Sequence, residues 1–263
     1  MIYFIADTHF GSPLHSDELL IERTFVKWCE AIAPTAESLF LLGDIFDFWY
    51  EYRYVVPKGF VRVLGALAHL ADSGVKLHYI VGNHDNWCRD YFQKELQVNL
   101  HPQAIELDLK GKIFRLAHGD EECRERSFRE DFMYRLFRSP IARRLLSAIH
   151  PRWVIPLGLG SAEASRRHGD KKPYDKGGPI ECEWLVKQAI QMEARSPEID
   201  YFLFGHRHLL ASHTFNENKK VVLLGDWLHY NSYASWDGNE LSLYRDVSLA
   251  HPQGTLLNEA TIE

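Results

Sequence analysis

Five apolar runs in this sequence each end in a sharp turn that carries residues able to bind a metal ion. Gly-Asp after a strand is ordinary turn chemistry when it occurs once. Here the design recurs along most of the chain, which indicates a metal site built at the ends of several strands. The runs and turns are Ile2 to Ala6 before Asp7-Thr8-His9, Ser38 to Leu42 before Gly43-Asp44, Leu77 to Val81 before Gly82-Asn83-His84-Asp85, Ile113 to Ala117 before His118-Gly119-Asp120, and Tyr201 to Phe204 before Gly205-His206-Arg207-His208.

The side chains in these turns limit the kind of metal. Carboxylate, imidazole and amide groups suit a hard to borderline divalent ion, so Mn²⁺, Fe²⁺, Zn²⁺ and Mg²⁺ all stay open. None of the turns contains a cysteine, which argues against a thiolate site. The candidates are too many for one catalytic ion that keeps an open position, and they suit two ions that share a carboxylate.

Length, charge and cysteine usage indicate a cytoplasmic protein. The 263 residues fit one elaborated domain with a large core. A formal net charge of −6 argues against a polyanion binder, so we expect no nucleic-acid partner. The four cysteines are scattered without a C-x-x-C pair, as in a reducing cytosol. The sequence starts with a strand rather than a signal segment, and no apolar run approaches the roughly 18 residues of a membrane span. Peripheral contact with a membrane surface remains open.

In chain order the turns are D-x-H, G-D-x-x-D, G-N-H-D, H and G-H-x-H, from Asp7 to His208. This order resembles the calcineurin-like metallophosphoesterases and covers most of the chain. The resemblance implies an α/β fold, the four-layer α/β/β/α sandwich, with residues 1–263 as a single domain. The sequence itself favours two mixed sheets flanked by helices, because strands alternate with helices over 17–33 and 59–71 and a hairpin follows over 105–116.

By this resemblance the site holds two divalent ions, for which we expect Mn²⁺. The implied ligands are Asp7, His9, Asp44 and His208 for the first ion, and Asp44, Asn83, His118 and His206 for the second, with Asp44 as the bridge. His84, next to Asn83, is expected to face the leaving group as a transition-state stabiliser or general acid. Asp85 is expected to support His84, and Asp47 is expected to be structural rather than a ligand.

Residues 121–176 differ from the rest of the chain. Between 124 and 176, ten arginines and three lysines stand against six acidic residues. Apolar residues recur there at helical spacing, and Pro140, Pro151 and Pro156 are expected to divide the segment into short helices. We predict a helical cap, inserted between the strand before His118 and the strand before His206. The apolar series is Phe128, Phe132, Leu136, Phe137, Ile141, Leu145 and Ile149.

Four stretches point to a narrower family: Asp7-Thr8-His9-Phe10, the Gly-Asp-x-Phe-Asp-x-Trp run of 43–49, His118-Gly119-Asp120 followed by Cys123, and Leu224-Gly225-Asp226-Trp227. Together with the insertion, they resemble the UDP-2,3-diacylglucosamine pyrophosphatases of lipid A biosynthesis. The resemblance implies hydrolysis of a lipid-linked nucleotide to UMP and 2,3-diacylglucosamine 1-phosphate, by a protein bound peripherally at the inner face of a bacterial membrane. The expected substrate contacts are Arg124, Phe128, Phe132, Ser161 and Ser165.

The sequence departs from this narrower family at two positions. Ser165 stands where the family's cap motif has asparagine, and His84 stands where better-known members have arginine. A soluble nucleotide or another phosphodiester therefore remains an alternative substrate, and a nuclease would show a basic groove with stacking aromatics. A binding module with a dead site is a third alternative. It would require missing ligands, and all seven are present in the sequence.

Overall fold

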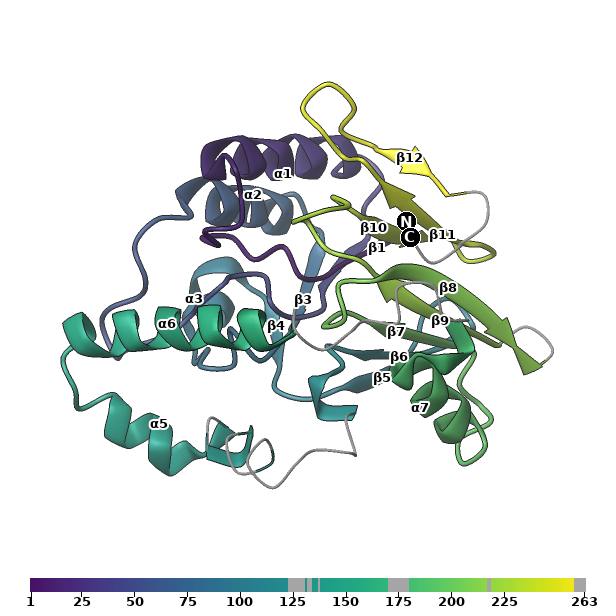
Figure 1. Cartoon of the computed structure of the whole chain (residues 1–263). Helices are drawn as coiled ribbons and strands as arrows, with labels where there is room; N and C mark the ends of the chain where they lie inside the picture. Colours follow the sequence, from purple (N-terminus) through teal and green to yellow (C-terminus); the bar gives the residue numbers. More distant parts are fainter. Residues whose placement is uncertain (123–130, 132–133, 137, 170–179, 217–218, 258–263) are drawn as a thin grey trace.

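The computed structural model describes residues 1–122, 131, 134–136, 138–169, 180–216 and 219–257, without the side chains of 140, 161–169 and 182. Within these ranges the strands form two mixed sheets (Figure 1). The larger sheet has the order β12 (Thr255–Leu256), β11 (Leu241–Arg245), β10 (Tyr233–Trp236), β1 (Ile2–Ile5), β2 (Ser38–Leu41), β3 (Lys76–Ile80) and β4 (Asn99–His101). The smaller sheet has the order β5 (Ile105–Asp108), β6 (Ile113–Ala117), β7 (Tyr201–Phe204), β9 (Lys219–Leu224) and β8 (Leu210–Phe215).

Helices cover the outer faces of both sheets. The α-helices of the described residues are α1 (Glu18–Ile32), α2 (Val61–Asp72), α3 (Tyr91–Leu96), α5 (Pro140–Leu146), α6 (Pro151–Gly169) and α7 (Trp184–Glu193). In Figure 1, α1 and α2 lie together on the outer side of the larger sheet, and α7 lies by the smaller sheet. The described part of the chain contains no helix that is long and apolar enough to cross a membrane.

The two faces of β1 show how the layers form. Tyr3 and Ile5 point into the core that the larger sheet shares with α1 and α2. Phe4 points the other way, because side chains alternate along a strand. Its ring stacks on Phe40 of β2 and on Phe114 of β6, with ring centroids 5.4 and 5.8 Å apart. Stacking between residues of different sheets places an apolar core between them.

The fourth layer is α7. Its buried Leu185 and Ala189 pack with Phe202 and Phe204 on the outer face of β7. The order of layers is therefore helices, larger sheet, smaller sheet and helix, which confirms the expected α/β/β/α architecture.

The early helices and the hairpin also match the sequence. Helix α1 begins after Asp17, whose side chain accepts a hydrogen bond from the Leu20 N–H at 2.9 Å as an N-cap. Strands β5 and β6 pair antiparallel, with Leu107 opposite Phe114, so the hairpin over 105–116 is confirmed.

Helices α5 and α6 lie in the segment between β6 and β7. Pro140 and Pro151 each begin a helix, where a missing N–H costs little. The expectation that Pro156 also divides the segment is wrong, since it lies inside the continuous helix α6. That helix is anchored nearby, because the buried Val154 packs in a cluster with Phe48.

Candidate metal centre

The candidate ligands follow strand ends that are level with one another. Ile5 pairs with Leu41 in the larger sheet, and Leu41 pairs with Tyr79 on the next strand. In the smaller sheet, Ala117 pairs with Phe204. All of these pairs are parallel, so the turns that follow them leave the two sheets at neighbouring edges. This register places residues from five parts of the sequence in one site.

The turns hold their ligands in a strained backbone conformation. Five of the seven predicted ligands have φ between +45° and +66°, the left-handed region that non-glycine residues rarely adopt. Such residues cluster at functional sites, where the surrounding structure maintains the strain. The five are Asp7, His9, Asp44, His206 and His208.

Two motif glycines are required by the close approach of carboxylates. A Cβ atom on Gly82 would lie 2.1 Å from Oδ1 of Asp44, and one on Gly205 would lie 2.4 Å from Oδ2 of Asp7. The same oxygens are fixed by backbone donors: Asp44 Oδ1 accepts from the His84 N–H at 2.9 Å, and Asp7 Oδ2 accepts from the His206 N–H at 2.8 Å. Each carboxylate is thus left with its other oxygen facing the site.

The first group of facing atoms comprises Asp7, His9 and His208. Asp7 Oδ1 lies 3.8 Å from His9 Nε2 and 3.6 Å from His208 Nε2. Asp7 and His9 are fully buried, whereas His208 is partly exposed. Asp7 Oδ1 and His9 Nε2 have no hydrogen-bond partner among the described residues. Unsatisfied buried polar atoms that converge on one point need a ligand, and a divalent cation fits this carboxylate and imidazole set.

The second group is centred on Asp44. Its Oδ2 lies 3.4 Å from His118 Nε2 and 3.8 Å from His9 Nε2, so one carboxylate faces both halves of the site. Asn83 Oδ1 lies 3.1 Å from His118 Nε2. The ring of His206 lies beside that of His118, with centroids 5.1 Å apart. The structure therefore brings all seven predicted ligands together, with Asp44 in the position expected of a bridge.

The electrostatics of the site keep the central carboxylate ionised. Burial alone would raise the pKa of Asp44, but the imidazoles of His118 and His84 hold it well below its usual value. The opposite balance acts on His118, where burial would lower the pKa and Asp44 raises it. Burial and the neighbouring His118 lower the pKa of His206 to about 4. The ionised carboxylate is the form that a divalent metal binds, and because the pKa of His118 is raised, its imidazole must give up a proton when a metal binds.

His84 lies at the edge of this cluster, but its support differs from the prediction. Its Nδ1 pairs with the backbone carbonyl oxygen of Asp47 at 2.8 Å, and its Nε2 lies 3.9 Å from Asp44 Oδ2. The expected contact with Asp85 is wrong. Asp85 points the other way and accepts hydrogen bonds from the N–H groups of Gly82 and Ile45, at 2.7 and 2.8 Å, and from the Tyr79 hydroxyl.

Asp85 therefore ties the turn of Asn83 to the turn of Asp44. Burial and the nearby Asp44 raise the pKa of Asp85 to about 6. Asp47 has the supporting role that was expected, since its Oδ1 lies 3.2 Å from His9 Nδ1.

One supporting residue was missed. Asp226 follows β9, is fully buried, and places Oδ2 at 2.8 Å from His208 Nδ1. The same oxygen lies 2.8 Å from Nδ1 of His229. Burial would raise the pKa of Asp226, but its bonds to both histidines hold it below its usual value. In the sequence, Gly225-Asp226 follows an apolar strand, as in the five ligand turns. This repeated pattern could have identified Asp226 as a residue of the site.

The predicted substrate contacts are not placed. Arg124, Phe128 and Phe132 lie outside the described residues, and Ser161 and Ser165 lie in α6 at positions whose side chains are not described.

Comparison with known proteins identifies the family of this chain. The family model described as calcineurin-like phosphoesterase matches residues 1–210. A Porphyromonas gingivalis protein named UDP-2,3-diacylglucosamine hydrolase is 48% identical over 251 residues, which cover 92% of this chain and 96% of that protein. A Haemophilus ducreyi protein of the same name is 30% identical, covering 86% of this chain and 91% of its own. A solved phosphoesterase from E. coli is 15% identical with a TM-score of 0.46, covering 100% of this chain and 99% of that one.

Proposed function

Because the chain belongs to the calcineurin-like phosphoesterase family, we propose that it hydrolyses the diphosphate of UDP-2,3-diacylglucosamine to UMP and 2,3-diacylglucosamine 1-phosphate, a step of lipid A biosynthesis. One observation carries the choice of substrate. The hydrolase from Porphyromonas gingivalis is 48% identical across nearly the whole of both chains, so the likeness includes the residues outside the metal centre.

The seven clustered side chains would hold two divalent ions, and Mn²⁺ is the metal we propose. The orphaned atoms Asp7 Oδ1 and His9 Nε2 mark the first position, and Asp44 Oδ2 faces both. When bound, a pair of divalent ions supplies charge neutralisation on phosphate oxygens and a water of lowered pKa.

The chain's own residues orient the reaction. Nδ1 of His84 is occupied by the Asp47 carbonyl oxygen, so Nε2 is the atom that faces the site. We assign this atom to the phosphoryl oxygens or the leaving group. Because the Asp47 carbonyl oxygen holds one proton on Nδ1, Nε2 carries an N–H for this role only when His84 is the imidazolium, which can stabilise developing negative charge or deliver a proton. Water attacks the phosphorus of the UMP moiety, the bond from that phosphorus to the bridging oxygen breaks, and the oxygen leaves on the lipid phosphate.

Residues 121–176 act as a cap that binds the lipid part of the substrate in this proposal. Helix α6 is joined to the core beside the ligand turns through Val154 and Phe48, and the Tyr50 hydroxyl donates to the backbone carbonyl oxygen of Arg143 at 3.0 Å. Arg124, Phe128, Phe132, Ser161 and Ser165 remain the proposed substrate contacts.

The outer faces of α5 and α6 suit the surface of a membrane. Ile141 and Leu145 are 72% and 67% exposed and share one face of α5, while Trp153 and Leu157 are 64% and 74% exposed and share one face of α6. The basic Arg144 is also exposed, and arginine is attracted to anionic lipid headgroups. We assign these faces to peripheral contact with the cytoplasmic side of the inner membrane, where the lipid substrate resides.

Single-turnover hydrolysis in ¹⁸O-labelled water tests the proposal. We expect metal-dependent cleavage of UDP-2,3-diacylglucosamine with the solvent oxygen in UMP. Label in the lipid product would contradict the position of attack. No cleavage of the lipid, combined with cleavage of soluble nucleotides, would contradict the substrate.

A further inference from the structure

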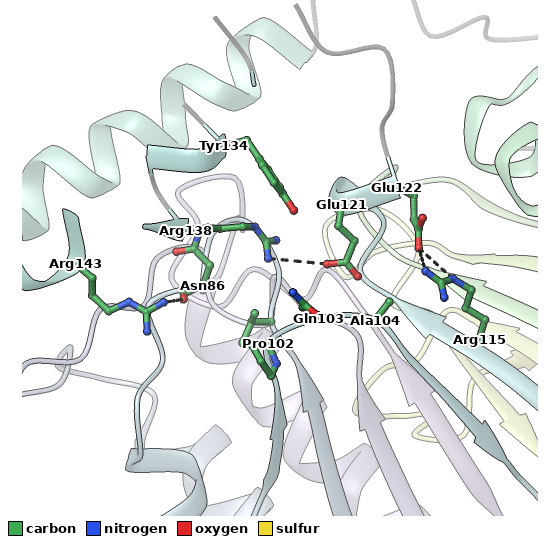
Figure 2. A pocket seen from close by; sticks show the side chains of 11 residues that line it. Asn86, Pro102, Gln103, Ala104, Arg115, Glu121, Glu122, Tyr134, Arg138 and Arg143 are labelled. Atoms are coloured by element: carbon green, nitrogen blue, oxygen red, sulfur yellow. Dashed lines mark hydrogen bonds and ion pairs between the residues drawn. The ribbon is translucent and has the colours of Figure 1, made fainter. Parts of the chain in front are cut away.

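A cavity lies beside the metal centre. It has a volume of about 530 Å³ and is lined by strand ends and by the described part of the cap. Val81 directly precedes the turn of Asn83, and Glu121 follows the turn of His118, so the lining is continuous in sequence with two of the ligand turns. Figure 2 shows Tyr134 and Arg138 on one side and Pro102 with Gln103 on the other.

The arginines of this cavity are already held by other groups. Arg138 Nη2 pairs with Asp120 Oδ2 at 2.8 Å. Arg115 pairs with Glu106 and with Glu122, and Arg143 donates to the backbone carbonyl oxygen of Asn86 at 3.0 Å. The walls are therefore charged, with their arginines paired to carboxylates or a carbonyl oxygen, which makes the cavity unsuitable for an acyl chain.

Two buried groups in the lining still lack hydrogen-bond partners among the described residues. Both carboxylate oxygens of Glu121 are unpaired, and Arg143 Nε is an unpaired donor. Among the described residues, Arg138 forms an ion pair with Glu121 in which Nη1 lies 3.9 Å from Oε2, beyond hydrogen-bond distance. The cavity thus offers both an acceptor and a donor to a polar ligand.

We infer that this cavity binds the uridine end of the substrate, with Glu121 accepting hydrogen bonds from its hydroxyl or imide groups. The inference rests on the proposed function. The glucosamine ring carries the acyl chains, so it must lie toward apolar surface, and uridine is the polar end that remains. Uridine has ribose hydroxyls and an imide N–H as donors and two ring carbonyls as acceptors. A carboxylate that accepts from ribose hydroxyls is a recurring solution in nucleotide sites.

The two hydrolysis products serve as separate probes. Inhibition constants for UMP and for 2,3-diacylglucosamine 1-phosphate would be measured for metal-loaded wild-type protein, Glu121→Gln and Glu198→Gln. Glu198 is an exposed carboxylate in the connection before β7, away from the cavity lining, and serves as the matched control. The Glu121→Gln variant replaces one acceptor oxygen by a donor and removes the charge.

We expect Glu121→Gln to weaken UMP binding about tenfold, the effect of losing one hydrogen bond to a charged group, and to raise KM for the lipid substrate by a similar factor. Binding of the lipid product should change much less, and Glu198→Gln should match wild type. Two results would overturn the uridine assignment alone, in a protein that hydrolyses UDP-2,3-diacylglucosamine. One is that Glu121→Gln weakens the binding of UMP and of the lipid product equally. The other is that it leaves UMP binding unchanged. Absence of that hydrolysis in wild type would instead overturn the proposed function.

Discussion

Asp226 Oδ2 lies 2.8 Å from Nδ1 of His208, on the side of the imidazole away from the metal centre. The other oxygen of Asp226 accepts backbone N–H groups, the shortest from His229 at 2.8 Å, so the carboxylate has a fixed orientation. A carboxylate on Nδ1 keeps the proton there and leaves the lone pair of Nε2 for a metal. The orientation of His208 in the first group therefore depends on a carboxylate outside that group.

We predict that Asp226→Asn lowers the affinity for Mn²⁺ by about 10- to 100-fold, the usual effect of losing such a partner. Titration calorimetry on metal-free protein measures it. His229→Gln removes the other histidine from the same oxygen and is the control, with affinity close to wild type expected. Equal losses in the two variants would contradict a specific role of Asp226 toward His208.

Gly82→Ala should remove metal binding and lower the thermal stability of the protein. Its Cβ would lie 2.1 Å from Asp44 Oδ1 and 2.5 Å from the Asp44 backbone nitrogen, so the turn that carries Asp44 must move together with the carboxylate. Gly65→Ala is the control, because Gly65 lies inside α2 with open space around it, and alanine there should stabilise the helix by about 0.5–1 kcal/mol. Metal titration and thermal unfolding on both variants check the prediction, and normal metal binding by Gly82→Ala would contradict it.

The ionised carboxylate of Glu121 should lower the free energy of unfolding, and the size of this effect should depend on pH. Burial, and then Asp120, raise its pKa to about 6 from a usual 4.5, while Arg138 and His118 oppose the shift. A folded-state pKa above the unfolded value means that the ionised group destabilises the fold. This cost is absent below pH 4.5, grows as the pH rises toward 6, and reaches about 2 kcal/mol above it.

Glu121→Gln should therefore be more stable than wild type at pH 8, and this advantage should shrink at pH 4. Urea unfolding at the two pH values measures it. A carboxylate kept at a cost in stability is expected where it serves binding. If Glu121→Gln is instead less stable than wild type at pH 8, Glu121 stabilises the folded protein and the prediction is contradicted.

The exposed faces of α5 and α6 give a prediction about membranes. Replacing Leu145 and Trp153 by serine should weaken binding to vesicles that contain anionic lipid, because an apolar side chain gains roughly 1.5–3 kcal/mol on full burial. Vesicle co-sedimentation measures it. Leu249→Ser removes another exposed leucine, outside α5 and α6, and should bind like wild type. If the wild type and all variants bind the vesicles equally well, the faces of α5 and α6 do not contact the membrane.

The sequence predicted the parts of the fold and site that depend on local pattern. An apolar strand followed by a sharp turn fixes where Asp7, Asp44 and His118 leave the sheet, and the order of turns identified the family. The partner of His84 could not be predicted in this way. Asp85 is adjacent in sequence, but its carboxylate is drawn to the N–H groups of Ile45 and Gly82, which only the tertiary fold brings near.

The cavity beside the metal centre was also outside the reach of sequence. Its lining combines the connection at 102–104, the turn after β6 and the cap, and no local period links these segments. The continuation of α6 through Pro156 could not be predicted from the sequence either. A proline inside a helix removes one hydrogen bond, but the nearby packing of Val154 against Phe48 belongs to the tertiary structure and cannot be seen in the apolar spacing.

Release of UMP from UDP-2,3-diacylglucosamine in detergent with added Mn²⁺, beside hydrolysis of bis-p-nitrophenyl phosphate, tests the central claim most directly. We predict fast, metal-dependent UMP release with little activity on the generic diester, and loss of both activities in Asp44→Ala. Hydrolysis of the generic diester without UMP release would leave the metal centre intact and contradict the lipid substrate. Full activity in Asp44→Ala would contradict the centre itself.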